Sequence, residues 1–269
     1  MNTLKNRVVV IIFYKNGNIV QSKNFKQHKI VGDPYLIIER LTAWNADEVI
    51  YLNIRPDLSD INRQDKNIKY LSNFDEIIRF VGKRAFMPLT VGGGIKKLED
   101  AEKYFRMGAD KISVNSILFD DPGVVYQCSK KFGSQAIVAS IDLKMDEECN
   151  YHIYKDCGKT LIKTPLHDYL MRIEDNGVGE LLINNIDRDG MANGYDLSLL
   201  KFIKKYTKLP IIFAGGVGKF EDLFEGIQNN INAVAAGNIF HHTENSYYEA
   251  MNFLYKKQCR TRPPVLFSL

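Results

Sequence analysis

The chain has 269 residues, of which 45% are hydrophobic and 25% are charged, and its net charge of +4 comes from Lys and Arg residues spread along its length. So diffuse a charge argues against nucleic-acid binding, and no run approaches the ~20 apolar residues of a membrane span. The four cysteines form no C-x-x-C pair, so we expect no metal site and no disulfide framework, and we expect no cofactor. The apolar run near the N-terminus is too short for a signal peptide, which predicts a soluble, cytoplasmic protein.

Strands and helices are predicted to alternate along the whole chain. We expect eight strands, at Val8–Phe13, Glu48–Ile54, Pro88–Val91, Lys111–Val114, Ala136–Leu143, Glu180–Asn184, Pro210–Ala214 and Ala233–Ala236. The helices that follow them are expected at Pro34–Trp44, Asn73–Val81, Lys97–Met107, Pro122–Phe132, Leu166–Asn176, Leu197–Tyr206, Lys219–Asn229 and Asn245–Lys257. Residues 21–32 are polar and predict a long loop, either a functional lid or simply mobile, whereas residues 145–164 predict an inserted hairpin around Gly158.

One stretch of the sequence occurs twice. PLTVGGGIKKLED at residues 88–100 is matched by PIIFAGGVGKFED at residues 210–222, and each copy reads as a strand, a glycine cluster and a helix. Eight such units with no linker between halves close into a barrel, whereas an open doubly wound sheet does not predict this repeat. The sequence therefore predicts an α/β fold in which residues 1–269 form a single (βα)8 TIM barrel made of two similar (βα)4 halves, about 1–133 and 134–257, with an irregular tail at 258–269.

The glycine clusters at 92–94 and 215–216 follow strands, at the end of the barrel where ligands bind. Glycine lets the backbone approach a phosphate closely, and the N–H groups that open the next helix supply partial positive charge. A single cluster is more simply explained as a tight turn. Two clusters at matching positions, each followed after the next strand by Asn115-Ser116 or Gly237-Asn238, favour two phosphate sites facing each other across the barrel mouth.

Acidic residues follow the fifth and sixth strands. Asp142 ends the fifth strand, where a carboxylate can point into the mouth and exchange protons with a ligand, or can cap a loop. Asp187, Asp189 and Gly190 follow the sixth strand in the turn IDRDG, which forms either a structural Asx-turn or ligand contacts. We expect contacts for Asp189 and Gly190.

Charged residues open four of the strands, at the opposite end of the predicted barrel. They are Arg7, Glu48, Lys111 and Glu180. Two positive and two negative groups form either routine surface pairs, which stabilise a protein little, or a charge-compensated gate around the barrel axis. Both interpretations fit their spacing.

The motifs TVGGGI, GADKISVN, FGSQAIVASID, LLINNIDRDG, PIIFAGGVGK and AVAAGNIFH resemble those of the cyclase subunit of imidazole glycerol phosphate synthase, usually called HisF. They lie in this order between about Arg7 and Phe240. The resemblance implies a (βα)8 barrel that docks a separate HisH-like glutaminase subunit at its N-terminal face. Ammonia would pass up the barrel axis and cleave and cyclise a bis-phosphorylated ribulosyl intermediate, giving imidazole glycerol phosphate and an aminoimidazole carboxamide ribotide.

The resemblance also implies roles for particular residues. The gate would be Arg7, Glu48, Lys111 and Glu180, the catalytic general base would be Asp142, and the phosphate contacts would be Gly94, Asn115, Ser116, Asp189, Gly190, Gly216, Gly237 and Asn238. One position departs from the family, whose other catalytic aspartate ends the first strand. Here that position holds Phe13, which cannot transfer a proton. The loop lysine of the family is also replaced, by Gln21, and the loss of a charge near a phosphate weakens binding.

A paralogous branch of the family is consistent with these departures. Similar barrels accompany sugar amidotransferases in surface-polysaccharide pathways, where they help to convert an acetamido group to an acetamidino group. The stretches Asn24-Phe25-Lys26 and Ile30–Pro34 look more like that branch. This resemblance implies a barrel that relays glutaminase-derived ammonia to a third protein. The alternatives are a histidine-biosynthesis cyclase that relies on Asp142, and a phosphate-binding scaffold that only activates its glutaminase.

Overall fold

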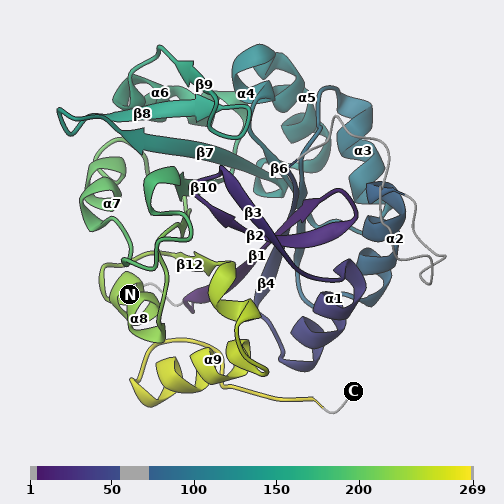
Figure 1. Ribbon diagram of the computed structural model, residues 1–269. Coiled ribbons are helices and arrows are strands. Elements are labelled where there is room, and N and C mark those ends of the chain that lie inside the picture. Colours follow the sequence, from purple (N-terminus) through teal and green to yellow (C-terminus); the bar gives the residue numbers. More distant parts are fainter. Residues whose placement is uncertain (1–4, 55–72, 268–269) are drawn as a thin grey trace.

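The computed structural model describes residues 5–54 and 73–267. In this part of the chain, eight parallel strands form a closed barrel with helices around its outside (Figure 1). The barrel strands are β1 (Arg7–Lys15), β4 (Glu48–Asn53), β5 (Leu89–Gly92), β6 (Lys111–Val114), β7 (Ile137–Met145), β10 (Glu180–Asn185), β11 (Ile211–Ala214) and β12 (Ala233–Ala236). The last strand pairs in parallel with the first, with Val8 opposite Val234, so the predicted (βα)8 barrel is confirmed.

Helices occupy the positions expected between the strands. They are α1 (Pro34–Ala43), α2 (Phe74–Arg84), α3 (Leu98–Arg106), α4 (Ile117–Asp120), α5 (Pro122–Phe132), α6 (Leu166–Arg172), α7 (Leu197–Ile203), α8 (Phe220–Gln228) and α9 (Ser246–Lys256). Two predicted helices are shorter than expected. Helix α7 ends at Ile203, and α6 is followed by a 3-10 helix at Ile173–Asn176. Within the described residues, no helix is long and apolar enough to span a membrane.

The repeated stretch has the same backbone conformation in both copies. Gly93 and Gly94 follow β5 with φ values of 102° and 73°, and Gly215 and Gly216 follow β11 with values of 100° and 102°. Residues other than glycine rarely adopt such positive φ values. An added Cβ would also lie 2.2 Å from the Asn53 carbonyl oxygen at Gly93. Each cluster therefore has a structural reason for glycine, independent of any ligand.

The similarity of the two copies extends to the start of the following helix. Three residues into α3, the Asp100 carboxylate accepts hydrogen bonds from the backbone N–H groups of Lys96 and Lys97. Asp222 does the same in α8, where it accepts from the N–H groups of Gly218 and Lys219. A carboxylate at this position satisfies N–H groups that have no partner within the helix.

The prediction of a loop at residues 21–32 is wrong. Strand β1 continues beyond the barrel to Lys15 and pairs antiparallel with β2 (Asn18–Lys23), which pairs with β3 (Gln27–Gly32). Asn24 and Phe25 form the tight turn between these strands, with φ values of 51° and 55°. We call residues 18–32 the first hairpin, and Figure 1 shows it crossing the centre of the barrel. The polar composition of residues 21–32 does not indicate strands. The strands form because β2 pairs with the extension of β1.

The second predicted hairpin is confirmed. Strand β7 also continues beyond the barrel, to Met145, and pairs antiparallel with β8 (Tyr151–Lys155), which pairs with β9 (Thr160–Ile162). We call residues 151–162 the second hairpin. The strand that opens each half of the barrel thus carries the same kind of antiparallel extension.

Apolar side chains form two separate clusters. The larger cluster fills the space between the barrel and its helices, and the smaller one lies on the barrel axis. The axial cluster consists of Val9, Ile11, Ile50, Val138, Leu182, Ile212, Ala214, Ala233 and Ala235, with Phe13 and Leu52 packed against it. It divides the polar groups at the two ends of the barrel from each other.

A close helix contact generates a test of this packing. Gly82 in α2 lies against the end of α3, and an added Cβ would be 2.1 Å from the carbonyl oxygen of Met107. Because backbone atoms cannot rotate away, we expect Gly82→Ala to lower the free energy of unfolding by about 2 kcal/mol or more, measured by urea denaturation. The neighbouring exposed Lys83→Ala should change it by less than about 0.5 kcal/mol. Equal effects would contradict this close packing.

Candidate functional site

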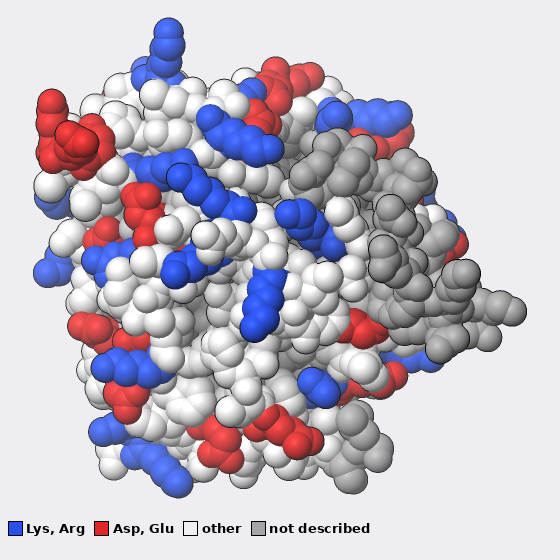
Figure 2. Space-filling view, viewed as in Figure 1, with Lys and Arg blue, Asp and Glu red and all other residues white. Residues whose placement is uncertain are grey.

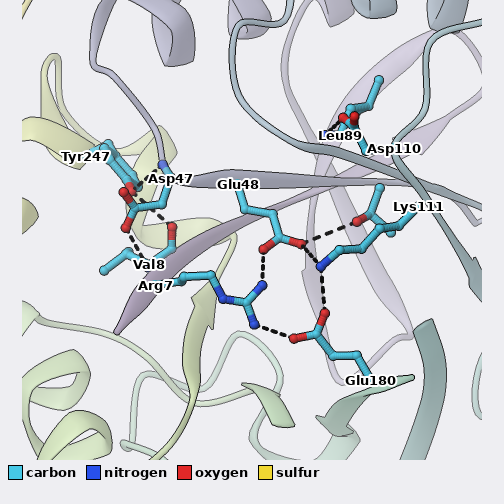
Figure 3. Close-up of polar contacts among 10 residues, drawn as sticks. Arg7, Val8, Asp47, Glu48, Leu89, Asp110, Lys111, Glu180 and Tyr247 are labelled. Atoms are coloured by element: carbon cyan, nitrogen blue, oxygen red, sulfur yellow. Dashed lines mark hydrogen bonds and ion pairs between the residues drawn. The ribbon is translucent and has the colours of Figure 1, made fainter. Parts of the chain in front are cut away.

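The four charged residues at the strand starts form a closed ring (Figure 3). The guanidinium of Arg7 binds one oxygen of Glu48 and one of Glu180. The Lys111 ammonium binds the other two oxygens, at 3.1 Å from Glu48 and 2.7 Å from Glu180. The two carboxylate side chains are only 2% and 7% exposed. The four groups therefore form a charge-compensated ring with buried carboxylates and partly exposed cations, and not the routine surface pairs that the sequence also allowed.

The ring lies at one end of the barrel axis, and its charges balance. Burial lowers the pKa of Arg7, but attraction to Glu48 and Glu180 outweighs this effect and leaves that pKa above its usual value. Two cations hold each carboxylate, so opening the ring requires at least one ion pair to break. Lys111 is the more easily displaced cation, because a lysine makes single contacts on a flexible stem whereas the arginine fork is rigid.

At the opposite end of the axis, Asp142 is held by two amides. Its carboxylate accepts hydrogen bonds from Asn184 Nδ2 at 2.9 Å and from Asn115 Nδ2 at 3.0 Å. Burial raises the Asp142 pKa to about 6, although both hydrogen bonds oppose the shift. A carboxylate with this pKa can gain or lose a proton near neutral pH, which is what a general base requires.

Phe13 lies on β1 at the same end of the barrel. It is paired with Leu52 on β4 and with Val20 on β2, and its ring packs edge-on against Phe25, with 6.4 Å between the ring centroids. A cavity in the mouth is lined by Phe13, Phe25, Asn184 and the glycines after β11 and β12. We did not predict Phe25 as a site residue from the residues themselves, because only the hairpin pairing brings it over the mouth.

The residues predicted to bind the second phosphate lie together in this cavity. We call Asp189, Gly190, Gly216, Gly237 and Asn238 the second cup. Two of its side chains hold the tip of the first hairpin. Asp189 accepts a hydrogen bond from the Ser22 hydroxyl at 2.6 Å and one from the Phe25 N–H at 3.1 Å, and Asn238 donates to the Ser22 carbonyl at 2.8 Å. Burial raises the pKa of Asp189.

One of the residues predicted to bind the first phosphate, Ser116, contacts the second hairpin. We call Gly94, Asn115 and Ser116 the first cup. The Ser116 hydroxyl donates a hydrogen bond of 3.0 Å to Asp156, in the turn of the second hairpin. Each hairpin therefore leaves one half of the barrel and contacts the cup of the other half. The tips also approach each other, because a Cβ at Gly158 would lie 3.6 Å from the Phe25 ring.

Basic side chains surround the mouth. Figure 2 shows Lys and Arg across the middle of this face, with most Asp and Glu nearer its rim. The first hairpin contributes exposed Lys23, Lys26 and Lys29, and its sequence contains no Asp or Glu. A surface of this kind attracts anionic ligands.

Other acidic residues near the mouth have structural roles. Asp187 accepts a hydrogen bond from the Met145 N–H at 2.8 Å, which fixes the extension of β7. Asp196 accepts from Asn185 at 3.0 Å and from Tyr151 at 3.0 Å. Among the residues that the structure describes, no group of three or more His, Cys, Asp and Glu side chains is placed to hold a metal ion.

The ring predicts a large effect on stability. Lys111→Met leaves two buried carboxylates with one cation, so we expect the free energy of unfolding to fall by roughly 3 kcal/mol in urea denaturation. The double variant Glu48→Gln with Lys111→Met should recover part of this loss, because it restores the charge balance. Lys131→Ala, which breaks the exposed pair with Glu102, should cost much less than Lys111→Met. Equal losses for the two lysines would contradict the buried ring.

The raised pKa of Asp142 predicts a pH-dependent stability. The folded state favours the protonated Asp142 carboxyl. Its contribution to the stability of the fold is therefore fully present below the ordinary aspartate pKa of 3.8, and it is lost as the pH rises through about 6. The shift corresponds to roughly 3 kcal/mol. We expect Asp142→Asn to gain stability relative to the wild type as the pH rises from 4 to 7, measured by urea denaturation at each pH. A difference that stays constant over this range would contradict the raised pKa.

Comparisons with known proteins found matches over most of the chain. The family described as "Histidine biosynthesis protein" matches residues 7–246. The chain is 34% identical over 254 residues to "Imidazole glycerol phosphate synthase subunit HisF" of Dictyoglomus thermophilum, which covers 94% of this chain and 97% of that protein.

Two further relatives are named "Putative imidazole glycerol phosphate synthase subunit hisF2". The one from Campylobacter jejuni is 39% identical over 240 residues, covering 88% of this chain and 90% of its own. The one from Vibrio vulnificus is 35% identical over 245 residues, covering 90% and 86%. Since these matches span almost the whole barrel, the chain belongs to the HisF family of imidazole glycerol phosphate synthase subunits.

Proposed function

We propose that this protein is the barrel subunit of a glutamine amidotransferase complex, and that it relays ammonia from a glutaminase for the acetamidino modification of a surface-polysaccharide sugar. The observation that carries the proposal is Phe13. Its ring packs against Phe25 in the mouth, at the position of the second catalytic aspartate of the family. A phenyl ring neither donates nor accepts a proton, and loss of a general acid or base typically lowers a rate ~10²–10⁴-fold.

The other end of the barrel supports the same proposal. A relay for ammonia needs a controlled entrance, and the ring of Arg7, Glu48, Lys111 and Glu180 closes the axis with balanced charge. Above the ring, the axial cluster of apolar side chains disfavours ammonium, because burying an unpaired charge is costly. Ammonia is neutral and small, so it is the form that such an interior would pass.

These features suggest three partners. A HisH-like glutaminase would dock at the N-terminal face, where the ring lies. A sugar amidotransferase would receive the ammonia. A phosphorylated small molecule would bind at the mouth, where the basic surface and the glycine-rich cups lie.

A second candidate function is the cyclase reaction of imidazole glycerol phosphate synthase, in the synthesis of histidine. The observation that favours it is Asp142, which is buried, held by two amides and has a pKa raised to about 6. In that case Asp142 would perform the acid–base chemistry without the second carboxylate.

The relay is tested by reconstitution with the glutaminase and the sugar amidotransferase. With glutamine as the nitrogen source, we expect amidino-sugar formation, measured by mass spectrometry, to require the barrel. With ammonium chloride in place of glutamine, the barrel should become dispensable, which shows that the amidotransferase itself is intact. Equal product from glutamine with and without the barrel would contradict the relay.

The cyclase reaction is tested with the bis-phosphorylated ribulosyl intermediate and an ammonium salt. We expect the wild type to form imidazole glycerol phosphate at least ~10²-fold more slowly than Phe13→Asp, because the variant restores the missing carboxylate. The double variant Phe13→Asp with Asp142→Asn is the control and should lose that gain. Wild-type turnover equal to that of Phe13→Asp would support the cyclase instead.

A further inference from the structure

We propose that Asp156 determines the ligand class of the mouth, so that the first cup accepts a hydroxyl or amino group in place of a phosphate. The ligand would then carry a single phosphate, held in the second cup. This inference rests on the proposed function, which includes a phosphorylated ligand at the mouth. Its basis is the contact between the second hairpin and Ser116.

Asp156 uses the group that a phosphate in the first cup would need. Its carboxylate accepts the hydrogen bond of the Ser116 hydroxyl at 3.0 Å, and its backbone N–H donates to the same hydroxyl oxygen at 3.4 Å. The serine hydroxyl has one proton to donate, and that proton is already bound by a carboxylate. A phosphate would have to displace this carboxylate.

The backbone of the second hairpin imposes the position of Asp156. Asp156 and Cys157 form its turn with φ values of 55° and 57°. Lys155 forms an ion pair with Asp120 on one side of the turn, and the Lys144 ammonium donates to the Gly158 carbonyl at 2.6 Å on the other. The carboxylate is therefore brought to the first cup by a turn that is anchored on both sides.

Charge then decides which ligand group fits. A phosphate beside a carboxylate is repelled, whereas a hydroxyl or an ammonium group can donate hydrogen bonds to it. The two cations at this turn are already engaged, because Lys155 is paired with Asp120 and the Lys144 ammonium donates to the Gly158 carbonyl. The chemistry of the first cup therefore suits a hydrogen-bond donor.

The second cup differs in this respect, although it also contains a carboxylate. Asp189 accepts hydrogen bonds from the Ser22 hydroxyl and the Phe25 N–H of the first hairpin, and burial raises its pKa, which favours the uncharged form. The glycines of this cup line the cavity. A ligand that matches both cups is a sugar monophosphate whose far end bears hydroxyl or amino groups.

The test compares a monophosphate with a bisphosphate. Ribose 5-phosphate and ribulose 1,5-bisphosphate are titrated into the full-length protein by isothermal titration calorimetry at pH 8. We expect the wild type to bind both with dissociation constants within threefold of each other. Asp156→Asn keeps the size of the side chain, and asparagine tolerates the left-handed turn. In this variant the bisphosphate should bind at least tenfold more tightly, and the monophosphate should change by less than threefold.

The control is Glu147→Gln, which removes the same charge from an exposed site just before the second hairpin and should change neither affinity by more than threefold. Wild-type binding of the bisphosphate at least tenfold tighter than the monophosphate, unaffected by Asp156→Asn, would overturn the role of Asp156 and leave phosphate binding intact. No binding of either compound to either protein would contradict the phosphorylated ligand itself. An equal gain in Glu147→Gln would reduce the effect to general surface charge and also overturn the inference.

Discussion

Parallel pairing of all eight barrel strands imposes the geometry on which the rest of this structure depends. Because β12 pairs in parallel with β1, every strand starts at one end of the barrel and ends at the other. Four charged residues at strand starts can then meet in a ring, although they are far apart in the sequence. The same constraint gathers Asp142, Phe13 and the glycine clusters at the opposite end.

The buried carboxylates at the two ends of the barrel have different partners. At the ring, two cations share four contacts with two buried carboxylates. At the mouth, Asp142 has amide partners instead of a cation, so burial dominates and its pKa rises. An apolar cluster separates the two environments. A charged ring below and a titratable carboxylate above are consistent with a path that a neutral nucleophile could follow.

The hairpins alter what the family resemblance implied about the mouth. Each hairpin contacts the cup of the other half of the barrel, and three side chains predicted to meet phosphate contact hairpin residues. Asp189 and Asn238 hold the first hairpin, and Ser116 holds the second. These three positions therefore have hydrogen-bond partners within the chain.

The sequence by itself determined the barrel, because apolar runs alternate with helical segments along the whole chain and the glycine cluster of residues 92–94 recurs half a barrel later at 215–216. It also determined the chemistry of particular positions, since a phenylalanine at residue 13 cannot act as an acid in any fold. Only the tertiary structure decided that the four charges form one buried ring and that residues 18–32 are a hairpin. The physical reason is that these features depend on long-range partners: the Ser22 hydroxyl that anchors the hairpin bonds to Asp189, 167 residues away. Local composition carries no record of such a pairing.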